Sequence, residues 1–203
     1  MATADGSNAE IDTRLFITVS GPPGCGATTL CKRLADAMGC PYVSGGDIFR
    51  ELADDRDMSL NQLTAEADGS DEIDRALDRR LQQIAEKWGM ANKPFILESR
   101  LAGWLAGERA DLRIWLDAPE DVRLERIDDR GETDAEMRVR EVSEAGRYQS
   151  YYEIDIGNQT FYDLQINTAR WSKHGVFSLV RTAIEEYDPE VDEGAFSTPT
   201  LEP

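Results

Sequence analysis

Apolar residues in this chain gather into short continuous runs separated by longer, mixed stretches. Runs of strand length occur at residues 15–19 (LFITV), 94–99 (PFILES) and 112–119 (LRIWLDAP), and shorter ones occur at 41–46 (PYVSGG) and 162–168 (YDLQINT). Apolar runs of this length, bounded by glycine, proline or polar residues, predict buried β-strands.

The stretches between these runs show helical spacing of apolar residues. They include residues 30–38 (LCKRLADAM, ended by Gly39), 71–89 (DEIDRALDRRLQQIAEKWG) and 176–187 (VFSLVRTAIEEY), and Asp47 is predicted to cap a further helix at DIFREL. Strands that alternate with helices predict an α/β fold, a five-stranded parallel sheet with helices on both faces. Polar residues follow every strand, as SGPPGCGATT, SGGD, ESR, DAPE and NTAR, so the site is expected at the carboxyl ends of the strands.

The stretch GPPGCGATT, residues 21–29, matches a phosphate-binding P-loop except at one position. The pattern G-x-x-x-x-G-K-[ST] is filled by Gly21, Gly26 and Thr28, whereas Ala27 stands where the lysine belongs. Glycines let successive N–H groups converge on phosphate oxygens at a helix N-terminus, and the Thr28 hydroxyl is placed to bind Mg²⁺. A plain glycine turn is the alternative, but the strand before the loop and the helix after it favour phosphate binding.

Glu98 closes the run PFILE, where P-loop enzymes place an acid near the water shell of the metal. A solvated strand end is the alternative for Glu98, and Arg100 is expected to face the same cleft. Residues 122–148 carry six arginines, Arg123, Arg126, Arg130, Arg138, Arg140 and Arg147. For most of these we predict a solvated, salt-bridged helix face. Because arginine grips phosphate with two N–H groups at once, a mobile lid that carries arginines is the competing hypothesis.

The charge balance is strongly acidic, with a formal net charge of −18 from 40 Asp and Glu against 22 Lys and Arg. Such a surface argues against nucleic-acid and anionic-membrane partners. Only four of the basic residues are lysine, which favours a salt-rich cytoplasm; an ordinary acidic protein is the alternative.

Three cysteines without C-x-x-C spacing, and no apolar run near 18 residues, predict a soluble cytoplasmic protein with reduced thiols. His174 is expected at the exposed start of a helix. As the sole histidine it supports neither a zinc site nor a Ser-His-Asp triad.

Several longer stretches resemble the archaeal-type cytidylate kinases, especially their haloarchaeal branch. They are VSGGDIFREL, ILESRLAGWLAG, IWLDAP, EAGRYQSYYEIDI and LQINTARW, and the resemblance runs from about residue 15 to residue 187. It implies an adenylate-kinase-like P-loop kinase, with monophosphate-binding helices and a lid, that moves the γ-phosphoryl group of ATP to CMP or dCMP with Mg²⁺. It also implies a kinase domain at 14–187, with a monophosphate-binding region at 44–90 and an arginine-rich lid at 122–152. The composition of the two acidic tails, residues 1–13 and 188–203, predicts that they are disordered. We expect a monomer whose partners are small nucleotides.

The resemblance also implies roles for individual residues. ATP would be held by Gly21, Pro22, Pro23, Gly24, Cys25, Gly26, Ala27, Thr28 and Thr29. The monophosphate substrate would be bound by Ser44, Asp47, Arg50, Arg100, Asn167 and Arg170. Thr28, Glu98, Arg130 and Arg147 would be catalytic, and Thr28 would also bind the metal.

Ala27 leaves two alternatives open. Loss of the lysine removes a charge-assisted contact worth about 1.5–3 kcal/mol, which we expect lid arginines to replace. A P-loop protein that keeps nucleotide binding without catalysis, and a kinase for another nucleoside monophosphate or small molecule, are the competing hypotheses.

Overall fold

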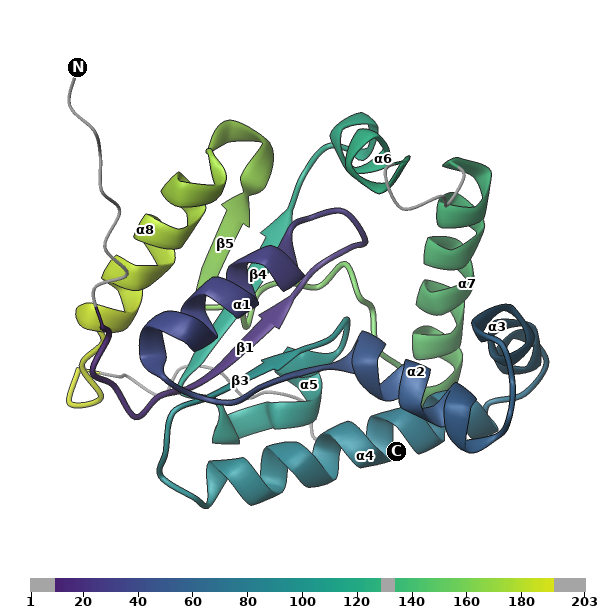
Figure 1. Cartoon of the computed structure of the whole chain (residues 1–203), viewed down its shortest axis with the longest axis horizontal. Coiled ribbons are helices and arrows are strands. Elements are labelled where there is room, and N and C mark those ends of the chain that lie inside the picture. The colour runs from purple at the N-terminus through teal and green to yellow at the C-terminus, as the bar shows by residue number, and fades with distance from the viewer. Residues whose placement is uncertain (1–9, 129–133, 192–203) are drawn as a thin grey trace.

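Five parallel strands form a single sheet in the computed structural model, which describes residues 10–128 and 134–191 (Figure 1). The strand order is β2-β3-β1-β4-β5. The strands are β1 (Phe16–Ser20), β2 (Tyr42–Ser44), β3 (Phe95–Glu98), β4 (Leu112–Asp117) and β5 (Leu164–Asn167). The predicted α/β fold with a five-stranded parallel sheet is therefore confirmed.

Helices cover both faces of this sheet. Successive strand residues point to opposite sides, and the apolar residues on each side are buried under helices. On β3, Ile96 packs against the core beneath α1 (Ala27–Met38) and α8 (Lys173–Glu185). Its neighbours Phe95 and Leu97 pack against the second core, beneath α4 (Glu72–Gly89) and α5 (Ala102–Ala106). The sheet is thus buried on both faces, which explains the continuous apolar runs in its central strands.

The remaining helices are α2 (Gly45–Asp55), α3 (Leu60–Gly69), α6 (Glu120–Asp128) and α7 (Asp134–Tyr152), with short 3₁₀ turns at Gly107–Arg109 and Thr168–Arg170. Figure 1 shows α2, α3 and α7 grouped on one side of the molecule, beyond the end of α4. In the described part of the chain, no helix is long and apolar enough to cross a membrane.

Two features of the α2–α3 region differ from the sequence-based expectation. The capping residue of α2 is Ser44 and not Asp47, because the chain passes from extended backbone at Ser44 directly into the helix and leaves Asp47 in the first turn. Helix α3 was not predicted. Its starting signal is a capping box in which Ser59 and Gln62 bond each other's backbone N–H groups.

The polar strand ends meet at one edge of the sheet, as predicted. The strand register places Glu98 beside both Val19 and Ser44, and Asp117 beside Asn167. The loop after β1 therefore emerges between the ends of β3 and β4, its two neighbours in the sheet.

Candidate active site at the carboxyl edge of the sheet

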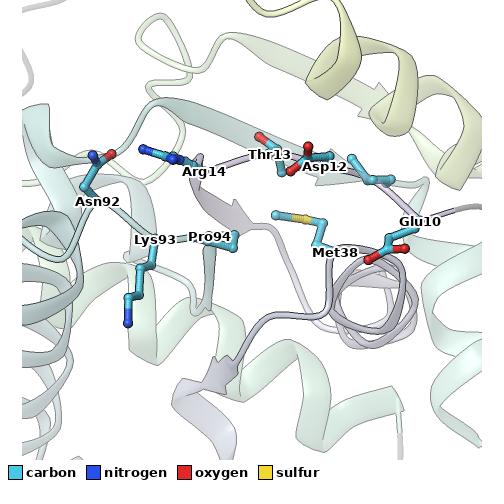
Figure 2. Close-up of a pocket in the computed structure, with 9 residues that line it drawn as sticks. Glu10, Asp12, Thr13, Arg14, Met38, Asn92, Lys93 and Pro94 are labelled. Atoms are coloured by element: carbon cyan, nitrogen blue, oxygen red, sulfur yellow. The ribbon is translucent and has the colours of Figure 1, made fainter.

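Two pockets among the described residues lie at the amino-terminal edge of the sheet, opposite the edge where the polar strand ends meet. The larger, of about 480 Å³, lies between the segment that leads into β1, the end of α1 and the loop before β3 (Figure 2). Arg14, Met38 and Lys93 are among its lining residues. None of the site residues predicted from the sequence lines this pocket.

The loop between β1 and α1 has the backbone that phosphate binding requires. Gly24 (φ 79°) and Gly26 (φ 96°) both adopt left-handed conformations. A side chain at Gly24 would also place its Cβ 2.6 Å from the carbonyl oxygen of Arg123. Gly26 caps α1, whose first turn carries no acidic residue, and a Cβ built there would meet no atom within 4 Å. The open, positively polarised N-terminus of α1 can therefore accept phosphate oxygens.

Thr28, Glu98 and Tyr42 form a hydrogen-bonded chain beside this loop. The Thr28 hydroxyl donates to Oε1 of Glu98 at 2.8 Å, and the Tyr42 hydroxyl donates to Oε2. Burial, followed by the bond to Glu98, raises the pKa of Tyr42 above its usual value, so the phenol remains a donor at neutral pH.

The oxygen atoms of Thr28 and Glu98 suit a hard cation such as Mg²⁺. Among the described residues, no group of three or more His, Cys, Asp or Glu could hold a metal by itself. Mg²⁺ usually binds through one or two protein oxygens together with substrate phosphates, so the residues present fit this ion.

Three side chains hold the phosphate loop from outside. The carbonyl oxygens of Pro23, Gly24 and Cys25 accept hydrogen bonds from Arg123 (3.1 Å), Arg126 (3.0 Å) and Thr168 (2.8 Å), respectively. Because the C=O and N–H groups of a trans peptide unit point in opposite directions, holding these carbonyls also fixes the direction of the N–H groups that follow. The phosphate loop is thus held in place by α6 and by the turn after β5.

This support corrects the prediction of a solvated face for two of the arginines. Arg123 is buried and forms an ion pair with Glu141 of α7, and Arg126 is half-buried. They lie on the inner face of α6, next to the buried Ile127, and this spacing was the signal in the sequence. Arg138, which pairs with Glu120 on the surface, does conform to the prediction.

Further arginine–carboxylate pairs join α7 to the turn after β3 and to α4. Arg100 Nε bonds Glu144 of α7 at 2.8 Å, and both side chains are only 17% exposed. Arg147 Nε forms an ion pair with Oδ2 of Asp74 on α4, 2.5 Å away. Arg100 and Arg147 therefore both lie at the α7 interface, each paired with a carboxylate.

Asp78 lies deeper between α4 and α7. Its carboxylate accepts a hydrogen bond from Tyr152 at 2.9 Å. The pKa of Asp78 is raised to about 7, chiefly by burial; the Tyr152 bond opposes this shift and the neighbouring Asp74 adds to it. Its charge therefore changes near neutral pH.

The other residues assigned to substrate binding fall into two places. Ser44 is buried at the end of β2, and the exposed Asp47 and Arg50 form an ion pair with each other on α2. Asn167 and Arg170 lie at β5, the opposite edge strand, roughly 19 Å away at the usual strand spacing. The structure does not bring these two to Ser44. They adjoin Thr168, which contacts the phosphate loop at Cys25. Arg130 lies outside the described residues.

Comparisons with known proteins agree with this geometry. Residues 17–149 match the family described as an AAA domain. A shikimate kinase from Bacteroides thetaiotaomicron has a similar fold (TM-score 0.57, 17% identity, 84% of this chain and 98% of that one). An uncharacterized protein from Eubacterium ventriosum is also similar (TM-score 0.62, 16% identity, 85% of this chain and 99% of that one). Fold and site together define a P-loop kinase.

Sequence relatives narrow the class. The chain is 50% identical to a cytidylate kinase of Haloquadratum walsbyi over 90% of its own length and 95% of the relative's. It is also 50% identical to one of Haloarcula marismortui (89% and 94%) and 43% identical to one of Pyrococcus horikoshii (90% and 94%). The chain belongs to the cytidylate kinase family, and the resemblance found in the sequence is confirmed.

Proposed function

We propose that this protein transfers the γ-phosphoryl group of ATP to CMP or dCMP. The observation that carries the proposal is the Thr28–Glu98 hydrogen bond beside the open N-terminus of α1, with Arg100 two residues beyond Glu98. The choice of cytosine as the nucleobase of the substrate is supported by the relatives, which are named cytidylate kinases. We also propose a salt-rich cytoplasm as its setting, because the net charge of −18 suits a concentrated salt solution.

In the proposed reaction the protein binds and orients two nucleotides. Backbone N–H groups at residues 24–29 would hold the ATP phosphates, and Thr28 and Glu98 would provide the protein oxygens for the metal. Mg²⁺, when bound, would neutralise charge on the β- and γ-phosphates. The acceptor is already a phosphate oxygen, so transfer needs alignment and charge stabilisation but no strong general base.

Arginines on the acceptor side would orient the monophosphate. We assign this role to Arg100, whose Nε is held by Glu144 and whose Nη atoms, at the other end of the guanidinium, can grip phosphate. Ser44, Asp47 and Arg50 are proposed to line the same side. Arg147, bound to Asp74 in this structure, would engage when α7 closes, and Arg130 is proposed to join it.

A coupled assay tests this function directly. With ATP and Mg²⁺ in molar potassium chloride, we expect CMP and dCMP to be phosphorylated well above AMP, GMP and UMP. Equal turnover of AMP would refute the base assignment. Binding of ATP without turnover of any monophosphate would favour the alternative, a nucleotide-binding module that lost catalysis with the P-loop lysine at position 27.

Thr28 provides a matched pair of variants for the same assay. Thr28→Val keeps the shape of the side chain but removes the hydroxyl, whereas Thr28→Ser keeps the hydroxyl. The valine variant should lose activity by about 10- to 100-fold, the usual cost of disturbing a metal environment, and the serine variant should retain it. Equal activities would remove Thr28 from the metal site.

A further inference from the structure

Tyr42 is a residue that the sequence did not single out. It lies on the edge strand β2, two residues before Ser44, and its ring is half-buried against the core beneath α1. Its hydroxyl crosses to the neighbouring strand β3 and donates to Oε2 of Glu98. Oε1 of the same carboxylate accepts the proton of Thr28 at 2.8 Å. Both oxygens of Glu98 are therefore held by hydroxyl groups.

We propose that Tyr42 is a positioning residue for the metal of the ATP complex. It holds the Glu98 carboxylate in the orientation that keeps the Thr28 proton directed at Glu98, so that the lone pairs of the Thr28 oxygen can face the cation. The inference rests on the proposed function, since it concerns the metal used in that reaction.

The physical reason lies in the single proton of a hydroxyl group. A serine or threonine hydroxyl has one proton and two lone pairs, and it can ligate a cation only through a lone pair. When Thr28 gives its proton to Glu98, the lone pairs remain available to the metal. If Glu98 turns away, the proton can point at the cation, and ligation is lost.

One hydrogen bond does not stop a carboxylate from rotating about its last single bond, because that torsion is broad. The second bond, from Tyr42, removes this freedom. The phenol remains protonated at neutral pH, since burial and Glu98 both raise its pKa. Tyr42 therefore acts on the metal through Glu98 and Thr28 without touching it.

Tyr42→Phe separates this role from packing. Phenylalanine keeps the ring that packs on the core and removes the hydroxyl alone. Tyr152→Phe is the matched control, because Tyr152 also donates its hydroxyl to a carboxylate, that of Asp78 at 2.9 Å, but between α4 and α7. Both variants lose one phenol–carboxylate bond, and only one loses it at the phosphate loop.

The measurement is Mn²⁺ or Mg²⁺ affinity by calorimetry, with the protein saturated by a non-hydrolysable ATP analogue in molar potassium chloride. We expect Tyr42→Phe to weaken metal binding by about 10-fold, as for other residues that support a metal ligand, and to leave the affinity for the metal-free analogue unchanged. The Mg²⁺ concentration for half-maximal rate should rise by the same factor. Tyr152→Phe should leave the metal affinity unchanged.

Unchanged metal affinity in Tyr42→Phe would overturn the proposal, and so would an equal loss in both variants, because the effect would then not be local to Glu98. Failure of the proposed function is distinguishable from either result. In that case the wild-type protein itself would bind no metal with the analogue, or would phosphorylate no monophosphate.

Discussion

Asp78 is a carboxyl group buried between α4 and α7, and Asp78→Asn is expected to stabilise the protein more at pH 8 than at pH 5. Its pKa is raised from 3.8 to about 7, chiefly by burial. The folded state therefore holds this proton more tightly than the unfolded state does. The resulting stabilisation is complete below about pH 4 and is lost as the pH rises through 7.

The magnitude follows from the size of the shift. A difference of about three pKa units corresponds to about 4 kcal/mol between the extremes of pH, at about 1.36 kcal/mol per unit. About 2.5 kcal/mol of this change falls between pH 5 and pH 8. Asparagine carries no titrating proton and can still accept the hydrogen bond from Tyr152. The stability of the variant relative to wild type should therefore rise by about 2.5 kcal/mol between these two pH values.

Urea unfolding at pH 5 and pH 8, in constant molar potassium chloride, measures this difference. Asp36→Asn, at an exposed position on α1, controls for the loss of one negative charge. If Asp78→Asn changes the free energy of unfolding by the same amount at both pH values, Asp78 does not titrate in this range and the reasoning is refuted.

Other predictions concern the arginines and the salt. Arg100→Ala should lower kcat/KM for CMP by about 10²-fold and leave ATP affinity unchanged in calorimetry; a loss of ATP affinity alone would reverse the assignment. Arg123→Ala should lower the free energy of unfolding by about 3 kcal/mol, against at most about 1 for Arg138→Ala, whose ion pair also joins α6 to α7 but is exposed. Equal losses in the two variants would show that burial does not determine how much these ion pairs contribute to stability. Arg126→Gln should weaken ATP binding about 10-fold, and adding Ala27→Lys should restore it. Removal of potassium chloride should lower the melting temperature, and a constant midpoint would contradict salt adaptation.

The fold was predictable because its signals are local and repeated. Each central strand is a continuous apolar run, and each is followed by polar residues that share one edge of the sheet. Helix α3 was not predicted because its sequence, LNQLTAEADG, has a weak apolar face and its capping box is a short signal. The assignment of Asp47 as a cap failed because strand and helix meet without a loop at Ser44.

The site was predictable where its residues follow strand ends and not where they act across the fold. Thr28 and Glu98 were selected from motif and position, and they form a hydrogen bond. Tyr42 was not selected, because tyrosine is common in strands as a packing residue. Only the pairing of β2 with β3 shows that its hydroxyl reaches Glu98. Arg123 and Arg126 were assigned to a solvated face because an alternating charge pattern does not show which side of a helix faces a loop about 100 residues away in sequence.

The charge missing at Ala27 can be traced through the same contacts. Ala27 packs against the core beneath α1, and the cations lie behind the loop instead. The charge of Arg123 is offset by Glu141, whereas Arg126 bonds only neutral oxygens of Gly24 and Thr168 among the described residues. At an effective dielectric constant of about 20, a unit charge contributes about 2 kcal/mol even at about 8 Å, so a cation behind the loop can stabilise a phosphate without touching it. Arg126, although it falls within the 122–152 range expected for the lid, is fixed behind the loop and acts in every state, whereas Arg147 on α7 would act only after closure. Rescue of Arg126→Gln by lysine at position 27 in ATP binding, before any chemistry, therefore separates these two sources of charge.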